Sequence, residues 1–187
     1  MVKQALSSRE QDDTRPVLLL AADQGRFGRI GQVMRAWSPA RVLKSVGQQI
    51  VREYTYAYVA VAPSLGEMAA LVLPCANTDM MSLFLEHVAQ VFAAFFVIIQ
   101  VDQASYHTSS DLVIPENIRL IPQPPRSAEL NPVEHIWEEV REKHFYNRVF
   151  DSMHDVIDTL CQGLRELMDM PERLRSLTNF PHLRITF

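Results

Sequence analysis

The segment Phe95–His107, with the sequence FFVIIQVDQASYH, decides the fold. It opens with a run of β-branched and aromatic residues. Continuous apolar character of this length predicts a strand that is buried on both faces, in a sheet covered by helices. Asp102 follows at the C-terminal end of this strand. Because ligands of open α/β sheets bind beyond the ends of strands, Asp102 is a candidate site residue.

A second carboxylate lies 32 positions further along the chain, in the sequence SAELNPVEHIW at Ser127–Trp137. The loop before this segment is stiffened by three prolines, Pro122, Pro124 and Pro125. Asn131 at the N-cap and a proline after it predict a helix that runs to about His144. Glu134 lies in the first turn of this helix, beside its apolar stripe. Taken alone, it is expected to complete a capping box with the Asn131 N–H.

A third carboxylate, Asp23, follows the apolar run Val17–Ala22, which predicts another buried strand. Gly25 and Gly28 come next and predict a turn into a second strand. Without further context, an aspartate at this place is best interpreted as a turn residue.

Taken together, these segments resemble the catalytic domain of mariner-like insertion-sequence transposases, which belong to the DDE transposases. The matching positions near the second and third carboxylates are Asp102, His107, Ser127, Leu130, Asn131, Pro132, Glu134 and Trp137. Around the first carboxylate, the matching positions are Asp23, Phe27, Gly28 and Arg35–Trp37. Three positions depart from the usual residues of the family: Gln24, Gln103 and Ala128 stand where Glu, Asn and Pro are frequent.

The resemblance implies an α/β fold of the ribonuclease H-like type. We expect a mixed sheet, in which a three-strand antiparallel meander is joined by parallel strands and flanked by helices. The further elements predicted are strands at Val51–Ala62, Met68–Leu73 and Ile114–Ile121, a helix capped by Asn77, and a last helical region at Ser152–Met170 ended by Pro171. We expect residues 1–16 to be a solvated polar leader and residues 17–187 to be the catalytic domain with its C-terminal helices.

The resemblance also implies that Asp23, Asp102 and Glu134 are catalytic and bind metal. Three crowded carboxylates repel one another unless a cation binds, and hard oxygen ligands suit Mg²⁺, with Mn²⁺ as a substitute. Two such ions would activate the nucleophile and stabilise the leaving oxygen of a phosphodiester. His107 either orients a substrate phosphate or metal-bound water, or is a buried structural histidine. Asn131 is expected to cap its helix and support the loop before Glu134.

Three arginines, Arg26, Arg35 and Arg126, are candidates for phosphate contacts, although solvated surface arginines are the default interpretation. The net charge of −4 and the pI near 5.8 argue that this domain alone binds DNA weakly. The two cysteines, Cys75 and Cys161, have no metal-type spacing and indicate reduced thiols in a cytoplasmic protein. No apolar run reaches the roughly 20 residues of a membrane span, so no membrane is expected as a partner.

The function expected from the resemblance is metal-dependent DNA strand cleavage and strand transfer during transposition. One alternative is a ribonuclease H-like nuclease that does not transfer strands, and another is a degenerate domain that binds a partner without catalysis. DNA, as transposon ends and target, is the expected partner. Relatives carry an N-terminal helix-turn-helix region, for which the residues before the first strand are too few. We therefore expect a separate helix-turn-helix polypeptide or a missing N-terminal domain, with a homodimer also open.

Overall fold

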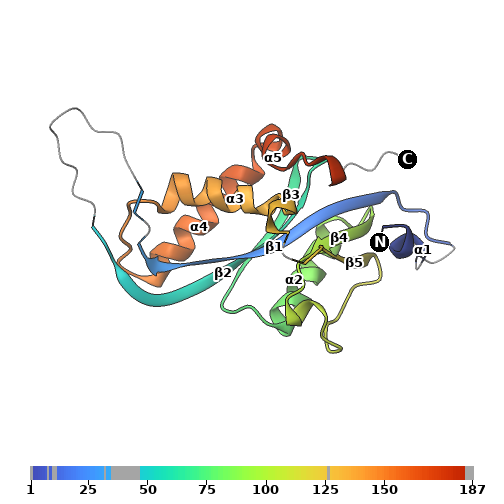
Figure 1. Cartoon of the computed structure of the whole chain (residues 1–187), viewed down its shortest axis with the longest axis horizontal. Helices are drawn as coiled ribbons and strands as arrows, with labels where there is room; N and C mark the ends of the chain where they lie inside the picture. Colours follow the sequence, from blue (N-terminus) through green and yellow to red (C-terminus); the bar gives the residue numbers. More distant parts are fainter. Residues whose placement is uncertain are drawn as a thin grey trace.

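The structure is a computed structural model that describes residues 2–7, 9, 12–31, 33–34, 47–125 and 127–183. One sheet with the strand order β3-β2-β1-β4-β5 organises the molecule (Figure 1). Its strands are β1 (Val17–Ile30), β2 (Ile50–Ala62), β3 (Glu67–Leu73), β4 (Phe96–Val101) and β5 (Ile118–Pro122). Arg35 and Arg126 lie outside the described residues.

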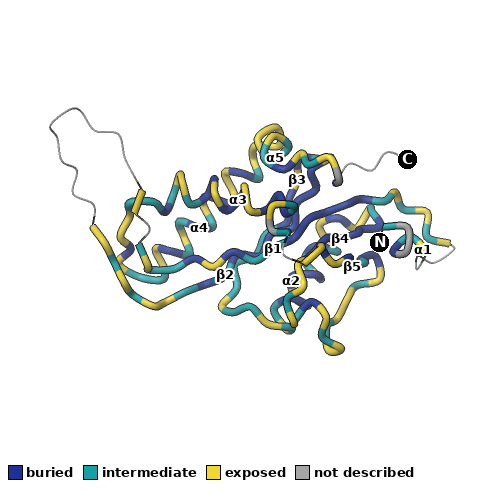
Figure 2. The backbone as a smooth tube through the Cα atoms, in the orientation of Figure 1, coloured by how far each residue is buried: buried dark blue, intermediate teal, exposed yellow. Residues whose placement is uncertain are grey.

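The sheet is mixed, as predicted. β1 pairs antiparallel with β2, and β2 with β3, which makes the expected meander. β4 pairs parallel with β1 on one side and with β5 on the other. Every residue of β4 is buried, because apolar side chains on both of its faces pack under helices (Figure 2). This arrangement leaves Asp102 as the first residue beyond the central parallel strand.

Helices cover both faces of the sheet (Figure 1). α2 (Thr78–Val91), capped by Asn77 as predicted, packs its apolar stripe on one face. The other face is covered by α3 (Val133–Val140), α4 (Met153–Met168) and α5 (Pro171–Thr178). Short helical segments complete the described chain: α1 (Val2–Ser7), η1 (Ser105–His107), η2 (Ala128–Leu130), the π-helix η3 (Arg141–Phe145) and η4 (Pro181–Leu183).

The predicted turn after Asp23 is wrong, because β1 continues without interruption to Ile30. The two glycines serve close packing instead of a turn. A Cβ atom on Gly25 would lie 2.9 Å from the Trp137 ring, and one on Gly28 would lie 2.1 Å from the carbonyl oxygen of Glu53. Asp23 therefore stands inside a long strand, two residues beyond the last parallel pair with β4, Ala21 with Gln100.

The boundaries of three other predicted elements also change. β5 begins at Ile118 rather than Ile114, since Pro115 accepts a hydrogen bond from the Ile118 N–H in a turn. The regular part of α3 ends at Val140, and the wider turn of η3 follows it. Pro171 ends the helical region at Ser152–Met170 as predicted, but it also begins α5, at the first helical position that suits a proline.

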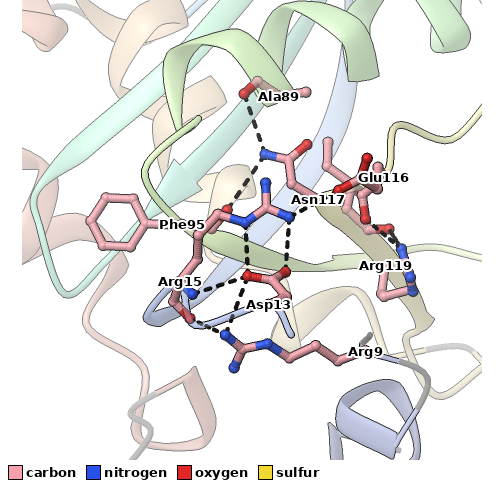
Figure 3. Close-up of polar contacts among 9 residues, drawn as sticks. Arg9, Asp13, Arg15, Ala89, Phe95, Glu116, Asn117 and Arg119 are labelled. Carbon is pink, nitrogen blue, oxygen red and sulfur yellow. Dashed lines mark hydrogen bonds and ion pairs between the residues drawn. The ribbon is translucent and has the colours of Figure 1, made fainter. Parts of the chain in front are cut away.

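The segment before β1 is more ordered than a solvated leader. Ala5 is buried in the core, and the carboxylate of Asp13 accepts hydrogen bonds at 2.9 and 2.8 Å from the Arg15 guanidinium (Figure 3). Arg15 also lies 3.4 Å from Glu116, just before β5. Part of this segment is thus packed against the domain, and its division from the domain at residue 17 stays a prediction. Within the described ranges, no helix has the length and apolar character to cross a membrane.

Candidate active site

The three carboxylates singled out by the sequence line one pocket of about 310 Å³. Asp23 comes from β1, Asp102 from the end of β4, and Glu134 from the first turn of α3. The rest of the described lining is polar or proline: Gln103, Gln123, Pro124, Pro125, Ser127 and Asn131. Two strands of the sheet and one covering helix thus bring together acidic side chains that are 111 residues apart at the extremes.

Asp23 is held by the helix that covers it. The Trp137 indole N–H donates to Asp23 Oδ2 at 3.0 Å, and the absence of a side chain on Gly25 lets the indole lie against the strand. Burial raises the pKa of Asp23, and the nearby charge of Asp102 adds to this, whereas the Trp137 hydrogen bond opposes it. The Asp23 carboxyl is therefore costly to ionise without a cation beside it.

Asp102 is fixed by a chain of hydrogen bonds behind it. His107 Nδ1 lies 2.7 Å from Asp102 Oδ1, and because a carboxylate only accepts, this nitrogen donates its proton. His107 Nε2 lies 3.3 Å from Gln24 Nε2. The side-chain oxygen of the same glutamine, Gln24 Oε1, accepts a hydrogen bond from the Tyr106 hydroxyl at 2.8 Å. The hydrogen bond from His107 holds the pKa of Asp102 below its ordinary value. His107 is a buried residue that supports Asp102.

Glu134 does not close the capping box that the sequence alone suggested. Within the described chain, its carboxylate accepts no hydrogen bond from the Asn131 N–H and instead lines the pocket. α3 begins at Val133 with Pro132 at its N-cap, one residue later than predicted, although Asn131 Oδ1 still accepts from the Val133 N–H at 3.1 Å. Asn131 Nδ2 lies 3.5 Å from the Ala22 carbonyl oxygen. Partial burial and the charge of Asp23 raise the pKa of Glu134.

The three carboxylates share a pocket but do not form a preorganised metal-binding site. No group of three His, Cys, Asp or Glu side chains within the described ranges is already arranged to hold a metal ion. The three side chains therefore share a pocket, and their role as metal ligands stays a prediction. No lysine or arginine belongs to its described lining, although Arg126 lies outside that part of the chain. Acidic oxygens that repel one another in a cleft without a cation fit a hard divalent ion.

The predicted phosphate contact Arg26 does not line this pocket. It lines a separate groove along the same strand.

Three residues of the site were not predicted as site residues. Gln103 and Gln123 belong to the pocket, where the Gln103 side chain donates to the Gln123 carbonyl oxygen at 2.9 Å. Trp137 was identified as a motif position without a role in the site, although a buried indole N–H requires an acceptor, which is Asp23.

Comparison with known proteins agrees with this geometry. A family model described as DDE superfamily endonuclease matches residues 19–157. An uncharacterized protein of Sinorhizobium fredii strain NGR234, y4pE/y4sA, is 35% identical over 128 residues, which are 66% of this chain and 93% of that protein.

Two of the similar solved structures contain the Mos1 transposase. The Mos1 strand transfer complex has a TM-score of 0.58 at 16% identity, covering 90% of this chain and 55% of that chain. The Mos1 mariner paired end complex with Mn has a TM-score of 0.56 at 15% identity, covering 87% and 56%. The present chain thus spans little more than half the length of the Mos1 chains, and the likeness shows the ribonuclease H-like fold. With a family model that matches most of its length, this chain belongs to the DDE superfamily endonucleases.

Proposed function

We propose that this chain is the catalytic domain of a transposase that cleaves DNA strands and transfers them in a metal-dependent reaction. The observation that carries the proposal is the shared pocket of Asp23, Asp102 and Glu134, whose described lining holds no cationic side chain. Membership of the DDE superfamily endonucleases supports it.

Asp23, Asp102 and Glu134 would hold divalent metal, Mg²⁺ with Mn²⁺ as a substitute, as two ions. When bound, such ions lower the pKa of a nucleophilic hydroxyl and neutralise the charge that develops on a phosphodiester. The raised pKa values of Asp23 and Glu134 support a site that is completed by a cation. We expect the nucleophile to be water in cleavage and a DNA 3′-hydroxyl in transfer.

The protein's own residues orient the carboxylates. His107 donates to Asp102 and the indole of Trp137 donates to Asp23, so that each aspartate has one oxygen fixed and one available. Asn131 links the start of α3 to β1 through the Ala22 carbonyl, which keeps Glu134 next to the strand that carries Asp23. Orientation of ligands before binding lowers the cost of assembling the site.

DNA is the proposed partner, both as transposon ends and as target, and the cytoplasm is the proposed location. The solved Mos1 complexes are named as strand transfer and paired end complexes of that protein. The net charge of −4 supports weak binding by this domain alone. We propose that sequence-specific recognition comes from a helix-turn-helix region outside these 187 residues, and that a homodimer would pair two DNA ends.

The test is a nicking and strand-transfer assay with Mg²⁺, Mn²⁺ or EDTA, on plasmid DNA and on duplexes with a free 3′-hydroxyl. The Asp102→Asn variant keeps the shape of the side chain and removes its charge, so both reactions should be lost. Asp111→Asn, an exposed aspartate on the loop after η1, is the matched control and should react like the parent. Equal nicking by Asp102→Asn and the parent, or cleavage that persists in EDTA, would contradict the proposal.

A further inference from the structure

A second hollow on the surface, which we call the arginine groove, lies beside the carboxylate pocket. Its described lining includes Arg26 of β1, Arg141 of η3 and Arg148 after η3, together with Phe27, Phe145 and Phe150. Three arginines in one groove are unexpected on a chain whose net charge is −4. Their gathering calls for a ligand with negative charge.

Each of the three guanidinium groups lies over an aromatic ring. Arg26 lies 4.6 Å from the ring centroid of Tyr54, Arg141 lies 5.1 Å from that of Phe27, and Arg148 lies 5.5 Å from that of Phe150. A ring under the flat face fixes the plane of a guanidinium while leaving its N–H edge free to donate. The groove therefore presents oriented donors rather than flexible cations.

No carboxylate within the described ranges lies at ion-pair distance from these three arginines. Their neighbour Arg29 differs, because its guanidinium lies 2.8 Å from Glu53. Within the described part of the chain, Arg148 is the only one of the three whose guanidinium donates a further hydrogen bond, to the His144 carbonyl oxygen at 3.1 Å. Arg26 and Arg148 are exposed, and Arg141 is partly exposed, so an anion can approach all three.

The groove lies at a defined distance from the carboxylates. Along β1, Arg26 follows Asp23 by three residues, or about 10 Å at 3.3 Å per residue. Along α3, Arg141 follows Glu134 by seven residues, or about 10.5 Å at 1.5 Å per residue and on the same side of the helix. The two elements run side by side in the same direction, since Trp137 contacts Asp23 and Phe145 contacts Phe27. The backbones of Arg26 and Arg141 thus lie about 10 Å beyond those of Asp23 and Glu134, with the Arg26 side chain on the opposite face of β1 from Asp23.

We propose that the arginine groove binds the DNA backbone, next to the stretch of DNA that reacts in the carboxylate pocket. The inference rests on the proposed function, since it assigns part of the same DNA substrate to a second surface. Guanidinium edges match phosphate oxygens in a two-point fork, and such contacts position a duplex without reading its sequence.

The test is the salt dependence of DNA binding by the full 187-residue chain, measured in EDTA so that no reaction is required. The probe is a fluorescent 30-base-pair duplex, titrated from 50 to 200 mM salt. Each phosphate contact contributes about 0.9 to the slope of log affinity against log salt. The triple variant Arg26→Gln/Arg141→Gln/Arg148→Gln should flatten that slope by about 2.7, whereas Lys at the same three positions should keep most of it.

The control for loss of charge elsewhere is Arg165→Gln/Arg175→Gln, which removes two positive charges from α4 and α5 and should leave the slope unchanged. Circular dichroism checks that each variant is folded. If the glutamine variant is not folded, the lysine variant tests the groove in its place. An unchanged slope in the triple variant, or no DNA binding by the parent at 50 mM salt, would overturn the assignment. So would loss of polyglutamate binding with DNA binding intact, which would assign the groove to an acidic peptide. Binding in EDTA requires no cleavage, whereas the catalytic proposal is tested by nicking with Mg²⁺ or Mn²⁺, so failure of the groove is distinguishable from failure of the catalytic proposal.

Discussion

Two glutamates on α3, only five residues apart, occupy opposite electrostatic environments. Glu134 lines the carboxylate pocket, and burial together with the charge of Asp23 raises its pKa. Glu139 is buried between cations, with carboxylate oxygens 2.6 Å from Lys143 Nζ and 2.6 Å from Arg173 of α5. The Arg173 hydrogen bond is the main reason that the pKa of Glu139 falls to about 2.

The difference separates a structural acid from one that awaits a ligand. The charge of Glu139 is already compensated, and its bonds to Arg173 fasten α5 to α3. The charge of Glu134 is uncompensated among the described residues of its pocket, so it can serve an added cation. Substituting each glutamate by glutamine, on the same helix, therefore tests function and stability separately.

The largest expected effect is on strand cleavage. Glu134→Gln should lower metal-dependent nicking by a factor on the order of 10²–10³, the range for removing one group that stabilises charge in a transition state. Glu139→Gln should nick within a few-fold of the parent, because its side chain does not line the pocket. Initial rates of plasmid nicking in Mn²⁺ measure both. Equal losses in the two variants would remove the distinction.

The next largest effect is on the stability of the fold, and here Glu139→Gln rather than Glu134→Gln should be the more affected variant. Glu139→Gln leaves Arg173 and Lys143 without their carboxylate and should cost about 2 kcal/mol of unfolding free energy. This is less than for a fully buried pair, because both cations are about half exposed. For a chain of this size, the melting temperature should fall by about 4–8 °C. Glu134→Gln should melt at or above the parent's temperature, since it relieves repulsion with Asp23. Thermal melts at neutral pH decide between these outcomes.

A smaller effect is expected from added metal. Mn²⁺ at ten times its dissociation constant should stabilise the parent by about 1.4 kcal/mol, or about 3–5 °C, because it binds only the folded pocket. Glu139→Gln should keep this increment, and Glu134→Gln should lose most of it. Melts with and without Mn²⁺, and with Ca²⁺ as a second oxygen-seeking ion, provide the comparison. A full increment in Glu134→Gln would show that this carboxylate is not a ligand.

The smallest effect concerns acid stability. The folded pKa of Glu139, about 2, lies below the ordinary value of 4.5, so its stabilisation is present above pH 4.5 and is lost as pH falls towards 2. At pH 3 the parent should have lost about 1 kcal/mol that Glu139→Gln never had, after allowing for the exposure of the partner cations. Glu134, with a raised pKa, should contribute with the opposite sign. Denaturant midpoints at pH 3 and pH 6 for the three proteins measure this difference. A constant gap between parent and Glu139→Gln would contradict it.

Strong local patterns made most of the fold predictable. The buried run before Asp102 and the helix start near Asn131 depend on residues close in sequence. The strand is where it was expected, and the helix begins within one residue of the predicted start, at Val133. The continuous β1 was not predictable, because a glycine signals equally a turn or a close approach. Only the position of Trp137, 112 residues after Gly25, decides between them.

The same reason limits what the sequence shows of the site. The carboxylates were identified by their motif, but the sequence alone could not show that Gln24 and Tyr106 stand behind His107, since that contact joins β1 to η1. Likewise, Glu139 and Arg173 are 34 residues apart, and nothing local marks them as partners. The catalytic roles of the three carboxylates stay a prediction until the variants are measured.

The hydrogen bond between Trp137 and Asp23 makes the intrinsic fluorescence of Trp137 a probe of the carboxylate pocket. The indole donates directly to a carboxylate of the pocket, so any change in the charge around Asp23 changes the electric field across the chromophore. The chain has two tryptophans, Trp37 and Trp137. With Trp37→Phe in place, the emission spectrum of the remaining indole follows occupancy at Asp23 in real time, without a label and without waiting for DNA to be cut.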